Sequence, residues 1–180
     1  MKSGIDLNKS AGVGLIEALV AALILSAGLL GIAKMESMAI SNTGVAGMRS
    51  IAAIEASSLA AAMHANSTAY WGAGLAPATI TISNNSISDP VLSQTVTCTS
   101  AATGCTGAQM AAYDLQQWAS TIQNLLPNPG ATINCSTSVL APVTCSIQIN
   151  WTEKNVSLNT NSSVSTGTTS PTSYTLIVEP

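Results

Sequence analysis

The sequence contains little charge and no phenylalanine. Only 7% of its 180 residues are charged, with 5 Lys and Arg against 8 Asp and Glu. A freely soluble enzyme usually carries far more charge than this. The net charge of −3 and the scattered cationic residues also offer no basic surface for a phosphate backbone. We therefore expect no direct nucleic acid binding by this chain.

The motifs of common catalytic and metal sites are missing as well. The sequence has one histidine, His64, no CxxC pair, and no HExxH, GxSxG or glycine-rich phosphate loop. These absences predict a protein that is not an enzyme and has no metal ion or cofactor. Disulfides are favoured over metal ligation for the four cysteines, which indicates an oxidising compartment such as the bacterial periplasm. They are Cys98, Cys105, Cys135 and Cys145.

What the sequence does contain is a long apolar run, residues 13–33, in which Glu17 is the only charged residue. As a helix rising 1.5 Å per residue it is roughly 31 Å long, enough to cross a bilayer. Lys2 and Lys9 precede it and favour a cytoplasmic leader. A secretory signal and a plain membrane anchor are the simpler interpretations. Neither explains a carboxylate that costs about 2 to 3 kcal/mol at the centre of the hydrocarbon.

The segment GVGLIE at residues 12–17 resembles the type IV prepilin cleavage signature, although Val13 and Gly14 replace the usual Phe and Thr. The resemblance implies that a prepilin peptidase cleaves between Gly12 and Val13 and N-methylates Val13. The natural partner of Glu17 is then the new amine of Val13 on a neighbouring subunit, because opposite charges attract strongly out of water. Glu17 is thus predicted to be an assembly contact.

Beyond residue 33 the helical pattern continues to about Asn66, and a loop from Tyr70 to Pro77 is expected after it. We expect the apolar stripe of this part to pack against a globular head. The predicted divisions are a leader at 1–12, a transmembrane and assembly helix at 13–33, an amphipathic continuation at 34–66 and a periplasmic globular head at 67–180. The stripe consists of Met35, Met38, Val45, Met48, Ala52, Leu59 and Met63.

In the head, short strands are predicted at residues 78–82 and 94–98, and a second helix at 109–126. Asp114 is interpreted as a helix-surface or capping residue rather than an acid catalyst, since no other carboxylate or base is near it in sequence. PNPG at residues 127–130 ends the helix. Its apolar face consists of Ala111, Leu115, Trp118, Ile122 and Leu125.

Two later segments, TINCSTSV and CSIQINW, alternate apolar and polar residues and form a plausible hairpin. Cys135 and Cys145 can meet across it, which favours that pair together with Cys98–Cys105, although three pairings are possible in principle. Residues 159–173 are expected to form an exposed loop and 174–178 a closing strand. The predicted fold is α+β and type IV pilin-like: a long N-terminal helix packed on a small antiparallel sheet with a second helix.

Most of the chain carries the resemblance further. The segments AAMHANSTAYWG, CTGAQMAAYDLQQWASTIQNLLPNPGATINC, SIQINWTEK and TLIVEP are similar to the type IV pilus modification protein PilV family of minor pilins. The resemblance implies a subunit that initiates or modifies pilus assembly together with other minor pilins and the major pilin, processed by prepilin peptidase. Its location would be the bacterial inner membrane and then the surface pilus. The alternatives are a type II secretion pseudopilin and a membrane-tethered or pilus-tip adhesin.

Overall fold

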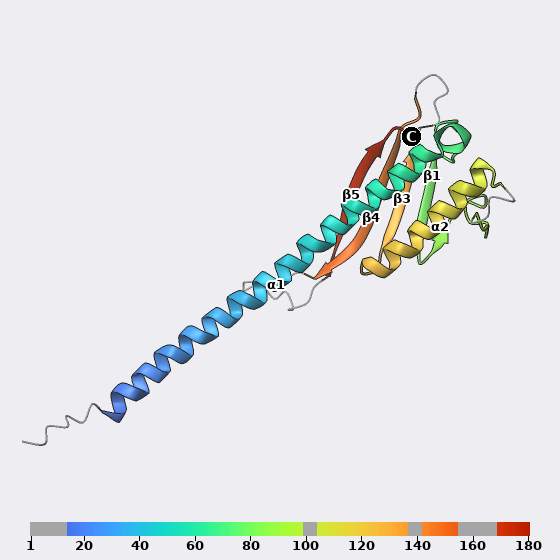
Figure 1. Cartoon of the computed structure of the whole chain (residues 1–180). Helices are drawn as coiled ribbons and strands as arrows, with labels where there is room; N and C mark the ends of the chain where they lie inside the picture. Colours follow the sequence, from blue (N-terminus) through green and yellow to red (C-terminus); the bar gives the residue numbers. More distant parts are fainter. Residues whose placement is uncertain (1–13, 99–103, 137–141, 155–168) are drawn as a thin grey trace, which may run out of the picture. The chain divides into compact units, whose positions relative to one another are not determined.

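The computed structural model describes residues 14–98, 104–136, 142–154 and 169–180. The chain divides into two compact units, residues 1–42 and residues 43–180. The described elements form an α+β arrangement with a long N-terminal helix, a second helix and an antiparallel sheet (Figure 1). In chain order they are α1 (Leu15–Ala65), η1 (Ser67–Trp71), β1 (Thr79–Ser83), β2 (Ser86–Ile87), α2 (Gly107–Leu125), β3 (Gly130–Cys135), β4 (Cys145–Lys154) and β5 (Thr169–Val178).

Helix α1 is continuous from Leu15 to Ala65, which confirms a single helix through the apolar run and its continuation. It is long and apolar enough near its start to cross a membrane, by length and composition alone. Within the unit of residues 43–180, α1 buries a stripe whose members lie three or four residues apart. Met35 of the predicted stripe is instead 72% exposed. The buried residues are Ala52, Ala56, Leu59, Ala60 and Met63.

The segment after α1 differs from the expected loop. Ser67 to Trp71 form a π-helical turn, in which the amides of Tyr70 and Trp71 both donate to the carbonyl of Asn66. The rings of Tyr70 and Trp71 are buried and meet edge to face with centroids 5.2 Å apart. Burial of two large aromatic side chains therefore draws this stretch into the core, although its neighbouring glycines are typical of a loop.

The sheet has five antiparallel strands in the order β2-β1-β3-β4-β5. The predicted alternation is confirmed in β4, where Cys145, Ile147, Ile149 and Trp151 are buried. The predicted hairpin is β3–β4, with Cys135 directly opposite Cys145. Both α2 and the later half of α1 contribute to the same core as the apolar face of the sheet (Figure 1).

Helix α2 begins at a capping box. The side chain of Thr106 accepts from the amide of Gln109, and the side chain of Gln109 accepts from the amide of Thr106. The helix ends at Leu125, which is 44% exposed, whereas Leu126 is 4% exposed. The prediction that Leu125 belongs to the buried face is wrong, because the extended backbone at Leu126 turns that next side chain inward.

The predicted strand at residues 94–98 is also wrong. The segment pairs with no described strand; the Gln116 amide donates to the Leu92 and Gln94 carbonyls at 2.9 and 2.6 Å instead. At the other end, β5 begins at Thr169, so residues 169–173 belong to a strand rather than to the expected loop. The remainder of that predicted loop, residues 159–168, lies outside the described residues.

Both disulfides are those that the hairpin interpretation favoured. Cys98 is bonded to Cys105, and Cys135 to Cys145. The first closes the segment that leads into α2, and the second joins the paired ends of β3 and β4. The disulfides thus constrain both a connection and the sheet within the unit of residues 43–180.

Candidate functional site

The N-terminal part of α1 presents an exposed apolar surface. Between Leu15 and Ile32 its large side chains are 53 to 86% exposed in this structure. Soluble proteins rarely expose a contiguous apolar surface of this kind, which normally marks a membrane or protein contact. The exposed residues are Leu15, Ile16, Leu19, Val20, Leu23, Ile24, Leu25, Leu29, Leu30 and Ile32.

Glu17 lies in the first turn of α1, where its amide donates to the carbonyl of Gly14 at 2.8 Å. A carboxylate in the first turn interacts favourably with the helix dipole. Among the described residues, its side chain has no hydrogen bond or ion pair, so the structure leaves its charge available for another molecule. The predicted cleavage and methylation residues, Gly12 and Val13, lie outside the described part of the chain.

A second polar feature joins α1 to the sheet. Arg49 Nε donates to Glu153 Oε1 at 3.1 Å, and Arg49 Nη2 donates to Glu153 Oε2 at 2.9 Å. Trp151 Nε1 also donates to Glu153 Oε1, at 3.2 Å. The Glu153 side chain is only 4% exposed, whereas that of Arg49 is 61% exposed. Hydrogen bonding from Arg49 is the main reason why the pKa of Glu153 is lowered, with smaller contributions from Thr172 and Trp151.

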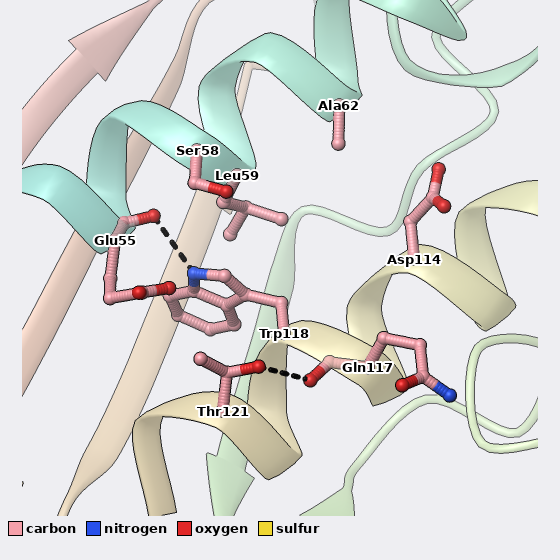
Figure 2. A pocket seen from close by; sticks show the side chains of 8 residues that line it. All are labelled: Glu55, Ser58, Leu59, Ala62, Asp114, Gln117, Trp118 and Thr121. Atoms are coloured by element: carbon pink, nitrogen blue, oxygen red, sulfur yellow. Dashed lines mark hydrogen bonds between the residues drawn. The ribbon is translucent and has the colours of Figure 1, made fainter. Parts of the chain in front are cut away.

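The third feature is a groove of about 300 Å³ between α1 and α2. Figure 2 shows that α1 lines it with Glu55, Ser58, Leu59 and Ala62, and α2 with Asp114, Gln117, Trp118 and Thr121. The two helices are joined beside it by a hydrogen bond of 2.8 Å from Trp118 Nε1 to the carbonyl of Glu55. The Trp118 indole lies between the two acidic side chains in this view (Figure 2).

Partial burial raises the pKa of both groove carboxyl groups, those of Glu55 and Asp114. Asp114 is half-buried, so the prediction of a helix-surface position is correct only in part. Glu55, which the sequence analysis did not connect with Asp114, lines the same groove. The lining residues include no histidine, cysteine or lysine that would serve as a base or nucleophile.

The single histidine, His64, is exposed in the last turn of α1. A second groove, of about 610 Å³ and mostly apolar, lies between this turn and β5. Within the described ranges, no three or more His, Cys, Asp or Glu side chains gather in a way that could hold a metal ion. His64 therefore belongs to no candidate metal site within the described part of the chain.

The sequence pattern identified Glu17 and the four cysteines but missed the Arg49–Glu153 pair and the groove. Arg49 and Glu153 are 104 residues apart in the chain, and Glu55 and Trp118 are 63 apart. No local signal connects such residues, although a charged side chain inside an alternating strand such as SIQINWTEK is a hint that it has a partner. No known protein family, characterised protein or solved structure that was compared with the chain matches it.

Proposed function

We propose that the chain is a minor pilin of a type IV pilus, a non-enzymatic subunit that helps to initiate or modify filament assembly. The observation that carries the proposal is Glu17: an exposed carboxylate in the first turn of an otherwise apolar helix, five positions after Gly12. The long apolar helix and the disulfide-bonded α+β unit support it. The proposed fold family is accordingly that of the type IV pilins.

In this proposal, residues 13–33 hold the newly made subunit in the inner membrane, with the unit that contains both disulfides in the oxidising periplasm. Prepilin peptidase then removes residues 1–12 and exposes an amine on Val13. Pairing that amine with Glu17 of a neighbour removes the cost of two unpaired charges in an apolar environment. The pair therefore favours one axial register between adjacent helices.

The class of protein is tested by mass spectrometry of the mature N-terminus. We expect a chain that begins with N-methylated Val13. An intact Met1, or cleavage after Ala33 as for a secretory signal, would contradict the proposal.

The role of Glu17 is tested with Glu17→Gln, which keeps the shape of the side chain and removes its charge. We expect normal processing at Val13 but loss of the subunit from sheared filaments, measured by immunoblotting of the membrane and filament fractions. Glu36→Gln is the matched control, because Glu36 is an exposed carboxylate of the same helix beyond the apolar run. Equal incorporation of both variants would exclude an assembly role for the Glu17 charge.

The same helix and charge also fit a pseudopilin of a type II secretion system. Deletion of the gene separates these functions, since a minor pilin is required for surface pili while secretion is unaffected. A strain that keeps its pili and loses only adherence would indicate instead a tethered or pilus-tip adhesin.

A further inference from the structure

Strand β5 is an edge of the sheet, beyond which no other described strand lies (Figure 1). The register of the sheet determines which of its backbone groups point outward. The amide of Ser136 donates to the carbonyl of Thr144 at 2.8 Å, and such hydrogen-bonded pairs recur at every second residue along β3 and β4. The intervening residues of β4, which are the odd-numbered ones from Cys145 onward, therefore direct their N–H and C=O groups toward β5.

Each of those odd-numbered residues is registered with an even-numbered residue of β5, in the range Ser170–Val178. The N–H groups of Ser173, Thr175 and Ile177 consequently point away from the sheet, and they have no partner among the described residues. Pro171 occupies another outward position, where its lack of an N–H group costs no hydrogen bond to β4. The edge thus offers donors and acceptors at the spacing of a β-strand.

The groove between α1 and β5 lies along this edge on the side of the core. Leu176 lines it from the strand and is half-buried, and the helix contributes Ser57 and Ala61, which are exposed. Ile177, whose side chain follows on the opposite face of β5, is 71% exposed. Edge strands usually prevent pairing with charged side chains, but residues 169–178 contain none. An extended segment with apolar side chains at alternate positions therefore complements both the backbone edge and the groove.

The direction of α1 identifies the occupant as a different polypeptide. Arg49 is bonded to Glu153, which lies opposite Ser170 at the start of β5. His64 lines the groove together with Val178 at the end of the strand, so this part of α1 runs in the same direction as β5. Pairing with the β5 of a second copy about a two-fold axis would make the two α1 segments antiparallel, whereas identical subunits held in one membrane are oriented alike. The other edge strand, β2, has two residues and is too short to replace it.

We propose that the outer edge of β5 binds an extended segment of a different subunit, which adds a strand beside Ser173–Val178. Alternate side chains of that segment are apolar and fill the groove between α1 and β5, and the others lie beside Ile177. The inference rests on the proposed function, because it names a contact of the assembled subunit.

Amide hydrogen exchange tests strand addition directly, because it reports whether the outward N–H groups have acquired acceptors. The full-length processed subunit is compared in detergent, alone and in purified filament-assembly complexes, by mass spectrometry that resolves single amides. We expect the amides of Ser173, Thr175 and Ile177 to exchange rapidly in the free subunit and roughly tenfold or more slowly in the complex. The amides of Leu176 and Val178, which face β4, are the internal control and should exchange slowly in both samples.

Two results would overturn the proposal. Rapid exchange of the three outward amides in the complex would show that no strand is added. Slow exchange of the same amides in the free subunit would show that another part of this chain, or a second copy, already covers the edge.

Thr175→Pro provides an independent readout, since it removes an outward N–H group that the sheet itself does not use. It should lower co-purification of the neighbouring subunits roughly fivefold, whereas Thr175→Ala, which keeps the N–H group, should have no effect. Melting temperatures are measured for both variants. Ser173→Pro, at the next outward position, replaces Thr175→Pro if that variant is destabilised, and the exchange experiment decides if both are.

Undiminished co-purification of a proline variant with native stability would exclude the contact. Methylation of Val13 and the dependence of filament incorporation on Glu17 are measured separately from β5. If both are found while the outward amides stay unprotected in the complex, the strand-addition proposal fails and the minor-pilin proposal remains.

Discussion

At the scale of single residues, Glu153 is the most constrained charge in the described structure. Its carboxylate is almost fully buried but accepts hydrogen bonds from the Arg49 guanidinium and from the Trp151 indole. A buried carboxylate persists only with such partners, because desolvation otherwise costs several kcal/mol. The pair also connects α1 to β4, so its loss weakens a long-range contact of the core.

We expect Glu153→Gln to lower the free energy of unfolding by about 1.5 to 3 kcal/mol, the range for hydrogen bonds to charged groups. The glutamine amide keeps the volume of the side chain, but its NH₂ group is a donor and cannot accept one of the two Arg49 hydrogen bonds. Denaturant unfolding monitored by tryptophan fluorescence measures the change, and Glu179→Gln at an exposed position is the control. Equal stability of the two variants would show that the ion pair contributes nothing.

The same carboxylate predicts how stability depends on pH. Its native pKa lies below the unfolded value of about 4.5, mainly through the Arg49 hydrogen bonds. The contribution of Glu153 is therefore complete above that unfolded value and is lost as pH falls through the native one. Glu55 and Asp114 affect stability in the opposite sense, because burial raises their native pKa values. The folded state binds protons at these two groups more readily than the unfolded state does, so their contribution to stability improves as pH falls.

Arg49→Met isolates the Glu153 contribution. We expect the acid unfolding midpoint to move to higher pH, since the partner that keeps the carboxylate ionised is gone. Circular dichroism followed from about pH 7 to pH 2 measures the midpoint. The variant Glu55→Gln should move the midpoint little or to lower pH, and a shift of both variants in the same direction would contradict the assignment.

At the scale of elements, the start of α2 is packed closely on the π-helical turn. Asn66 Nδ2 donates to the carbonyl of Gly107 at 2.7 Å, and a Cβ atom at Gly107 would collide with the backbone carbonyl and Cβ of Ala69. Glycine is needed here for the approach of two backbones rather than for an unusual φ angle.

We expect Gly107→Ala to reduce the free energy of unfolding by about 1 to 3 kcal/mol, the cost of overpacking a close contact. Gly104→Ala is the matched control in the same connection, because a Cβ there meets nothing within 4 Å. Its effect should stay within about 0.5 kcal/mol. Denaturant unfolding of both proteins gives the comparison, and similar losses would show that the contact between α2 and η1 is not tight in solution.

Element by element, prediction from the sequence succeeds where periodicity continues over many residues. The alternation in CSIQINW and the helical pattern from Gln109 located β4 and α2, since each pattern states which side chains one face must bury. The segment 94–98 has strand-forming residues but pairs with no strand among the described residues, and composition does not reveal whether a pairing partner exists. The loop prediction at Tyr70 and Trp71 was wrong for a related reason, because the core that accepts their rings is built from distant elements.

At the scale of the whole molecule, the candidate functional residues also fall into those that a local sequence pattern reveals and those that only tertiary packing brings together. Glu17 could be identified because its oddity is local: one charge in an apolar run. The groove and the Arg49–Glu153 pair could not, since tertiary packing creates them from residues 63 and 104 positions apart. Sequence reasoning therefore singled out the assembly contact proposed for Glu17 and missed the ion pair and the groove in the unit of residues 43–180.

The division of the chain into units of residues 1–42 and 43–180 predicts independent folding of the second unit. Among the described residues, every buried apolar side chain lies at Ala52 or later. We therefore expect a protein lacking residues 1–42, exported to the periplasm, to be soluble without detergent and to form both disulfides, as shown by size-exclusion chromatography and peptide mapping. Removal of residues 1–56 is the control, because it deletes Arg49, Ala52 and Ala56 and should prevent stable folding. Aggregation of the shorter deletion would mean that the exposed apolar helix stabilises the fold itself rather than serving membrane insertion and assembly alone.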